Sequence, residues 1–83
     1  MLKRSKHVII SEILDICKDG ANKTRIVYQA NLNFKTVDPY IDLLVKNDLL
    51  EVRREKNVLY ETTHKGKKML DDFKQINSQL SEL

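Results

Sequence analysis

The side chains that most often carry acid–base or metal chemistry are few in this sequence and poorly spaced for either task. The two histidines, His7 and His64, have no third ligand at metal-binding spacing. Asp71 and Asp72 are neighbours, and on a helix they would point about 100° apart, so they do not form a carboxylate dyad. A glycine-rich phosphate loop is also missing. We therefore expect no enzyme, and no metal, cofactor or small-molecule ligand.

Basic side chains, by contrast, gather in three stretches of the chain. Residues 1–7 carry three positive charges and no acid, and residues 22–36 carry three more without an acid. Residues 53–68 hold six basic side chains against two acidic ones, whereas the stretches between are net acidic. Such segregation favours a basic face for a polyanion. Ordinary solvated charge would give the same pattern and stays open as the alternative.

Length and composition limit the fold. Eighty-three residues make one domain, or one small domain with an appendage, and leave a thin core that a partner subunit could extend. The chain is 41% apolar and 33% charged, which is typical of a globular, helix-rich protein. A single cysteine, Cys17, rules out an intrachain disulfide and favours a reducing compartment. With no apolar run of about 20 residues and no signal-peptide pattern, we expect a cytoplasmic protein without a membrane partner.

Hydrophobic spacing predicts three helices in the first part of the chain. The first is capped by Ser5 and runs to about Asp19, with its apolar residues on one side. A short second helix follows a cap at Asn22 and ends near Ala30. Asn33 then caps a third helix. Two helices joined by a three-residue turn form the helix-turn-helix unit.

Pro39 lies inside this third helix, where it removes a backbone donor and clashes with the preceding turn. Either the helix starts at Phe34 and bends at the proline, or Asp38 caps a new helix whose first residue is Pro39. We favour the bent, continuous helix. It places the proline on the outward face, with Lys35 one turn back.

Alternating apolar residues predict two strands, at 49–53 and 58–62, joined by a tight hairpin in which Asn57 tolerates a positive φ. After three helices, this hairpin is the wing of a winged helix. The predicted fold class is therefore α+β, mainly α. It combines a winged helix-turn-helix domain at residues 1–63 with a C-terminal dimerisation helix at residues 64–83.

Apolar residues in the last helix recur four, three, four and three positions apart, which gives a narrow heptad stripe. The stripe exceeds what a small winged domain covers, so a second copy of the chain is the expected partner. Packing of this helix on its own domain is the alternative. The predicted dimer interface is Met69, Phe73, Ile76, Leu80 and Leu83.

The run at residues 20–34 (GANKTRIVYQANLNF) resembles the signature of small archaeal winged-helix DNA-binding proteins, the ten-kilodalton, chromatin-associated type. Residues 43–50 (LLVKNDLL) and 60–66 (YETTHKG) are also similar to that family. The resemblance implies a homodimer joined by an antiparallel coiled coil of the last helices, with two winged heads on DNA. This sequence departs from the family pattern at Pro39 and at the acids Asp38 and Asp42, on or near the third helix.

In a helix-turn-helix on DNA, the second helix crosses the backbone and the third enters the major groove. Phosphate contacts are expected from the start of the second helix and from the wing, and base or phosphate contacts from the start of the third. The predicted DNA-binding residues are Lys23, Thr24, Arg25, Asn33, Lys35, Thr36, Arg53, Arg54 and Lys56. Asn33 also has the simpler role of a helix cap. Tyr28 either contacts a phosphate or lies half-buried in the core.

The function that fits best is a dimeric protein that binds double-stranded DNA and regulates transcription, located in the cytoplasm on the nucleoid. A chromatin-like architectural protein is one alternative, and it would rely mainly on phosphate contacts. A winged helix used for protein–protein contacts is another. The acids Asp38 and Asp42 keep this second alternative open.

Overall fold

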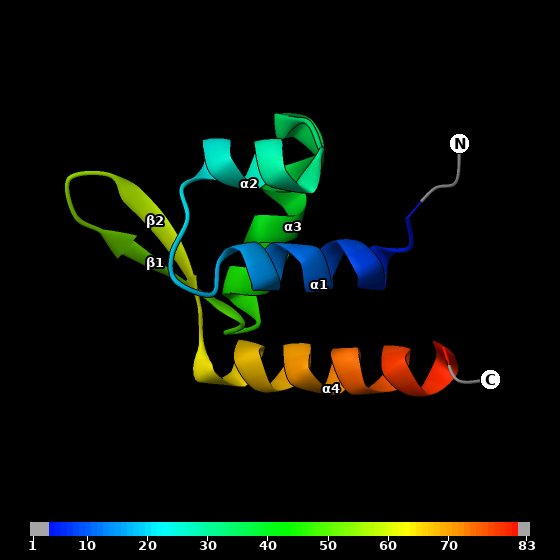
Figure 1. The fold of residues 1–83 in the computed structure, drawn as a ribbon. Coiled ribbons are helices and arrows are strands. Elements are labelled where there is room, and N and C mark those ends of the chain that lie inside the picture. Colours follow the sequence, from blue (N-terminus) through cyan, green and yellow to red (C-terminus); the bar gives the residue numbers. More distant parts are fainter. Residues whose placement is uncertain (1–3, 82–83) are drawn as a thin grey trace.

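The computed structural model describes residues 4–81. Three helices precede a two-stranded antiparallel sheet, and a long helix follows it (Figure 1). The elements are α1 (Lys6–Ile16), α2 (Lys23–Ala30), α3 (Phe34–Lys46), β1 (Leu50–Arg54), β2 (Val58–Thr62) and α4 (His64–Ser81). The predicted fold class, a mainly helical α+β winged helix-turn-helix, is confirmed. No helix in this part of the chain is long and apolar enough to cross a membrane.

Side-chain caps begin the first three helices where the sequence predicted them. Ser5, Asn22 and Asn33 each accept a hydrogen bond from the backbone amide three residues later, at 3.2, 2.8 and 2.8 Å. The end of α1 was predicted less well, since the helix stops at Ile16 and a turn follows it. Gly20 leaves that turn with φ of +93°, a conformation that favours glycine.

The turn between α2 and α3 depends on two asparagines. Asn31 adopts the left-handed conformation, with φ of 55° and ψ of 49°, and so ends α2. Two residues later Asn33 begins α3, which is unbroken through Pro39 to Lys46. The continuity of the helix that we favoured is therefore confirmed, and the alternative of a new helix capped by Asp38 is wrong; the bend at Pro39 stays a prediction.

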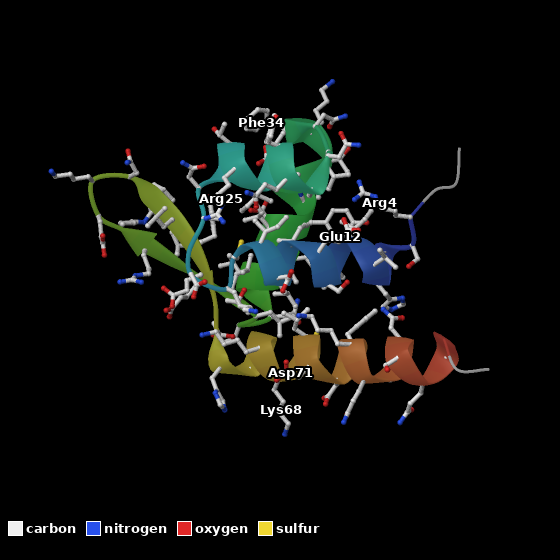
Figure 2. All side chains as sticks on the ribbon, in the orientation of Figure 1. Arg4, Glu12, Arg25, Phe34, Lys68 and Asp71 are labelled. Carbon is white, nitrogen blue, oxygen red and sulfur yellow. The ribbon has the colours of Figure 1, made fainter. Side chains whose placement is uncertain are left out.

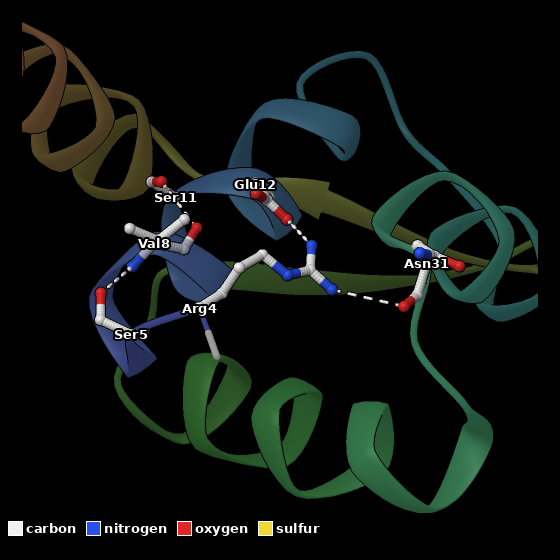
Figure 3. A network of polar contacts seen from close by, with 6 residues as sticks. All are labelled: Arg4, Ser5, Val8, Ser11, Glu12 and Asn31. Atoms are coloured by element: carbon white, nitrogen blue, oxygen red, sulfur yellow. Dashed lines mark hydrogen bonds and ion pairs between the residues drawn. The ribbon is translucent and has the colours of Figure 1, made fainter. Parts of the chain in front are cut away.

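Arg4 ties the start of the chain to this turn. Its guanidinium forms an ion pair with Glu12 of α1 and donates a hydrogen bond to the backbone carbonyl of Asn31 at 3.3 Å (Figure 3). The turn that sets the angle between α2 and α3 is thus held from the side of α1. Asn31, the left-handed residue of this turn, is therefore held by a side chain from outside the helix-turn-helix.

The two strands pair in antiparallel register, from Leu50 opposite Thr62 to Arg54 opposite Val58. A third segment joins them, because the backbone of Ala21 exchanges two hydrogen bonds with that of Tyr60, at 3.0 and 2.8 Å. The chain entering α2 is thereby fixed to the wing. The expectation of a positive φ at Asn57 is wrong: among the described residues, the non-glycine residues with positive φ are Asn31 and Asp48.

The core lies where α1, α2 and α3 meet, and it is closed by the base of the wing and by one residue of α4. Its buried members are Ile9, Ile13, Leu14, Cys17, Ala21, Ile26, Val37, Ile41, Leu44, Leu49, Leu50 and Leu70. Cys17 is fully buried in this core. Burial raises the pKa of its thiol to about 12.

Helix α4 runs alongside α1 (Figure 1). Leu70 is buried against the core, and the ring of the half-buried Phe73 lies 6.0 Å from that of His7. Lys74 pairs with Asp15 of α1 at 3.2 Å. The first half of α4 therefore packs on its own domain, and Phe73, predicted for the dimer interface, already has a partner within the chain.

Other members of the predicted stripe remain on the surface. Met69, Ile76 and Leu80 are 39%, 56% and 59% exposed, respectively. Leu83 lies outside the residues that the structure describes. The apolar surface of α4 therefore increases toward its C-terminal half, beyond the part that packs on α1.

Candidate nucleic-acid interface

The start of α2 lies beside the second turn of α3. The Lys23 ammonium contacts the Asp38 carboxylate at 2.7 Å. This hydrogen bond is the main reason why the pKa of Lys23 is raised, and nearby charges, including that of Asp42, add to the effect. Lys23, which the sequence predicted as a phosphate contact, is thus held by an acid of α3.

The outer side of α2 carries an unexpectedly exposed tyrosine. Tyr28 is 85% exposed, so the alternative of a half-buried core position is wrong. Thr24 and Arg25 are exposed on the same helix, and the Arg25 guanidinium donates to the backbone carbonyl of Gly20 at 3.3 Å. All three side chains are thus exposed on the first two turns of α2.

At the start of α3 the predicted residues separate into different environments. The Asn33 side chain accepts from the amide of Thr36, so it is used as a cap. Thr36 itself is half-buried, whereas Lys35 is exposed. Lys35 makes no hydrogen bond or ion pair with any other residue of the described range 4–81. Of these three, Lys35 is the one whose side chain is available to a ligand.

On the wing, the two adjacent arginines lie on opposite faces of the hairpin. Arg53 pairs with Glu61 on the neighbouring strand and with Glu55 at 3.3 Å, and the hydrogen bond to Glu61 is the main cause of its raised pKa. Arg54 points to the other face, toward α3. Arg54 and Lys56 are exposed and have no ion-pair partner among the residues described.

Between α3 and the wing lies an open groove of about 720 Å³. It is lined by Lys23 and Thr24 of α2, by Phe34, Ile41, Asp42, Val45 and Lys46 of α3, and by Val52, Arg54, Val58 and Tyr60 of the wing. Three of the predicted residues, Lys23, Thr24 and Arg54, are therefore brought together at one surface. Arg53 is not among them, because it faces away.

The groove residues that were not predicted from the sequence include a cation and an aromatic residue of α3. Lys46 is the last residue of α3, and its position eleven residues after Lys35 returns it to the same side of the helix. That spacing could have identified it once the helix was taken as continuous. Phe34 is 49% exposed at the junction of α2 and α3, and Figure 2 shows it there. An aromatic residue in a first helical turn gives no such signal in the sequence.

Residues 4–81 contain no cluster of three or more histidine, cysteine, aspartate or glutamate side chains that could hold a metal ion. The groove and its flanks instead combine separate cations with exposed apolar side chains. This arrangement suits an extended anionic surface, which contacts many side chains weakly, better than it suits one small reacting group.

A family model described as winged helix-turn-helix matches residues 3–81. The chain belongs to the winged helix-turn-helix family. Among curated proteins, it is 40% identical over 75 residues to the uncharacterized protein MJ0287 of Methanocaldococcus jannaschii, covering 89% of this chain and 74% of that protein. It is also 37% identical over 76 residues to MJ0290 of the same organism. That match covers 90% of this chain but only 35% of MJ0290.

Two solved winged-helix structures share its fold. The DNA-binding protein Sso10a-2 from Sulfolobus solfataricus is 31% identical, with a TM-score of 0.78 over 95% of this chain and 87% of that one. BpsR from Bordetella bronchiseptica has the same TM-score of 0.78 at 20% identity, over 89% of this chain and 56% of that one, and it shows the fold alone. The predicted membership of a small archaeal winged-helix family is therefore confirmed.

Proposed function

We propose that this protein is a homodimer that binds double-stranded DNA and regulates transcription. The observation that carries the proposal is the groove between α3 and the wing, with the start of α2 at its end and unpaired cations along its edges. In winged-helix proteins of this kind, α3 would enter the major groove while α2 and the wing contact the flanking backbone. The similarity to Sso10a-2, a DNA-binding protein, supports the same function.

Phosphate contacts would come from two sides of α3. Thr24, Arg25 and Tyr28 offer exposed polar groups on α2, and Lys23 joins them if a phosphate displaces Asp38. On the wing, Arg54 and Lys56 are the available cations. Arg53 would contribute less, because a phosphate must compete there with two carboxylates of the protein.

Sequence reading would fall to the exposed side of α3. Lys35 is the best placed of the predicted residues, since Asn33 serves as a cap and Thr36 is half-buried. The same side carries Asp42, which repels phosphates. An architectural protein that depends on phosphates alone gains nothing from an acid there, and this favours a regulator over the chromatin-like alternative.

Dimerisation would use the exposed apolar side of α4. Met69, Ile76 and Leu80 lie on one stripe and keep 39%, 56% and 59% of their surface exposed in the described chain. A second α4 packed on this stripe would remove that surface from water. Two winged heads would then bind two half-sites whose spacing is set by the dimer.

Fluorescence anisotropy with random and selected duplexes, measured across a salt series, tests this function. A regulator should prefer its selected duplex by about 10³-fold or more, whereas an architectural protein should bind both alike with a steep salt slope. Failure to bind any duplex, by a folded dimer, would favour the use of this domain for protein–protein contacts. Sedimentation on the same samples determines the oligomeric state.

A further inference from the structure

The outward side of α3 bears a charge pattern that ordinary DNA binding does not require. Lys35, Pro39, Asp42 and Lys46 follow one another at spacings of four, three and four residues, and all four are exposed. The opposite side of the helix is buried through Val37, Ile41 and Leu44 and faces the core. The outward stripe therefore places an acid between two cations.

Asp42 lies at a spacing along α3 from which homeodomain-type helices contact bases. Homeodomain-type reading helices contact bases with residues spaced i, i+3, i+4 and i+7. Counted from Lys35, these positions are Lys35, Asp38, Pro39 and Asp42. Proline has no side-chain donor or acceptor, so the two acids are the groups here that can accept a hydrogen bond.

The two acids differ in what they already contact. The Asp38 carboxylate is bound to the Lys23 ammonium at 2.7 Å. Asp42 makes no hydrogen bond or close ion pair with the residues that the structure describes, and it lines the open groove. Its oxygens are thus unoccupied and directed at the surface that DNA would cover.

The surroundings of Asp42 would let it approach DNA. Lys23, Lys46 and Arg54 line the same groove, and each attracts the phosphates that Asp42 alone would repel. A carboxylate has only acceptors, so at the base edges it is repelled by guanine N7 and O6 and by thymine O4. Adenine also presents an amino donor, N6, but the acceptor N7 beside it repels a carboxylate, so the N4 amino group of cytosine is the donor that suits Asp42 in the major groove.

We propose that Asp42 is a specificity-determining residue, whose carboxylate accepts a hydrogen bond from the N4 amino group of a cytosine in the major groove. The inference rests on the proposed DNA binding and adds the class of base that the middle of α3 reads. The half-site should then contain a C·G pair at one fixed position opposite Asp42. The penalty that the acid imposes on other sequences helps to exclude them.

Selection from a randomised duplex library tests the inference, with the wild type, Asp42→Asn and Asp42→Ala compared. The wild type should select cytosine at one position by about 5- to 150-fold over other bases. Asp42→Asn should change that preference to adenine, whose N6 and N7 an amide can bind, and Asp42→Ala should abolish it. Both variants should bind random duplexes more tightly than the wild type, most clearly at low salt.

A matched control separates the effect of a lost negative charge from the effect of a lost base contact. Asp71→Asn removes one negative charge on α4, where Asp71 projects from the side of the molecule opposite Phe34 (Figure 2). It should leave the selected sequence unchanged. Thermal unfolding should show that all variants fold, because Asp42 and Asp71 are both exposed.

A base analogue tests whether Asp42 contacts the N4 amino group of the cytosine. Replacing the selected cytosine by 2-pyrimidinone removes the N4 amino group, which should weaken the wild type about 5- to 150-fold more than Asp42→Ala. Equal losses in both proteins would overturn the proposal, as would a selected sequence that does not change in Asp42→Asn. A wild type that binds every duplex equally overturns the cytosine contact while DNA binding stands. A wild type that binds no duplex overturns both.

Discussion

The Lys23 ammonium lies 2.7 Å from the Asp38 carboxylate, so a cation at the start of α2 is held by an acid of α3. Asp38→Asn should release Lys23 for a phosphate and also remove a repelling charge. We expect tighter binding to all duplexes and a salt slope steeper by about 0.9, the contribution of one phosphate contact. Anisotropy titrations at several salt concentrations measure both. With Lys23→Ala in the same background the added slope should disappear, and if it remains, Lys23 does not contact DNA.

The wing offers a comparison between two neighbouring arginines. Arg54→Ala and Lys56→Ala should each weaken binding to all sequences alike and flatten the salt slope by about 0.9, because both side chains are free. Arg53→Ala is the matched control and should have a smaller effect, since Arg53 is paired with Glu55 and Glu61. Equal losses for Arg53 and Arg54 would show that DNA displaces those acids. If none of the three changes affects affinity, the wing does not contact DNA.

Much of the fold was predictable because its signals are local. The caps Asn22 and Asn33 directly precede the segments that form α2 and α3, so the helix-turn-helix follows from the sequence alone. Which of the predicted cations form ion pairs within the protein was not predictable in this way. Lys23 meets Asp38 only because α2 and α3 cross, and Arg53 meets Glu61 only because the hairpin has its particular register. Tertiary pairing determines which predicted site residues are free.

Gly66 in the first turn of α4 lies close to the backbone of Leu49, just before β1. A Cβ at this position would lie 2.3 Å from the carbonyl oxygen of Leu49, a contact that requires the backbone to move. Gly66→Ala should therefore lower the free energy of unfolding by about 1–3 kcal/mol, despite the higher helix propensity of alanine. Urea unfolding measures this. Lys67→Ala, at the exposed neighbouring position, should stay within about 0.5 kcal/mol of the wild type.

The buried thiol of Cys17 makes stability depend on alkaline pH. Its pKa is raised from the ordinary value near 9 to about 12 by burial, so the unfolded chain releases this proton at lower pH than the folded one. The contribution of this thiol to the free energy of unfolding is therefore constant below about pH 8 and falls as the pH rises from 9 to 12. Between pH 8 and 10 the loss from this group should be about 1.4 kcal/mol. Urea midpoints at both pH values should show that loss in the wild type and not in Cys17→Ala, and identical pH dependence in the two proteins would refute the assignment.

The C-terminal half of α4 tests the proposed dimer. Ile76 and Leu80 are 56% and 59% exposed, so placing charges there should cost the monomer little while it disrupts an apolar interface. The double variant Ile76→Asp with Leu80→Asp should sediment as a folded monomer and bind a two-half-site duplex far more weakly. The control with Gln75→Asp and Ser78→Asp adds the same charge away from the stripe, at exposed positions of the same helix, and should stay dimeric. Phe73 is unsuitable for this test because it already packs near His7, and its loss would also disturb α1. A double variant that remains dimeric would place the interface elsewhere on the surface.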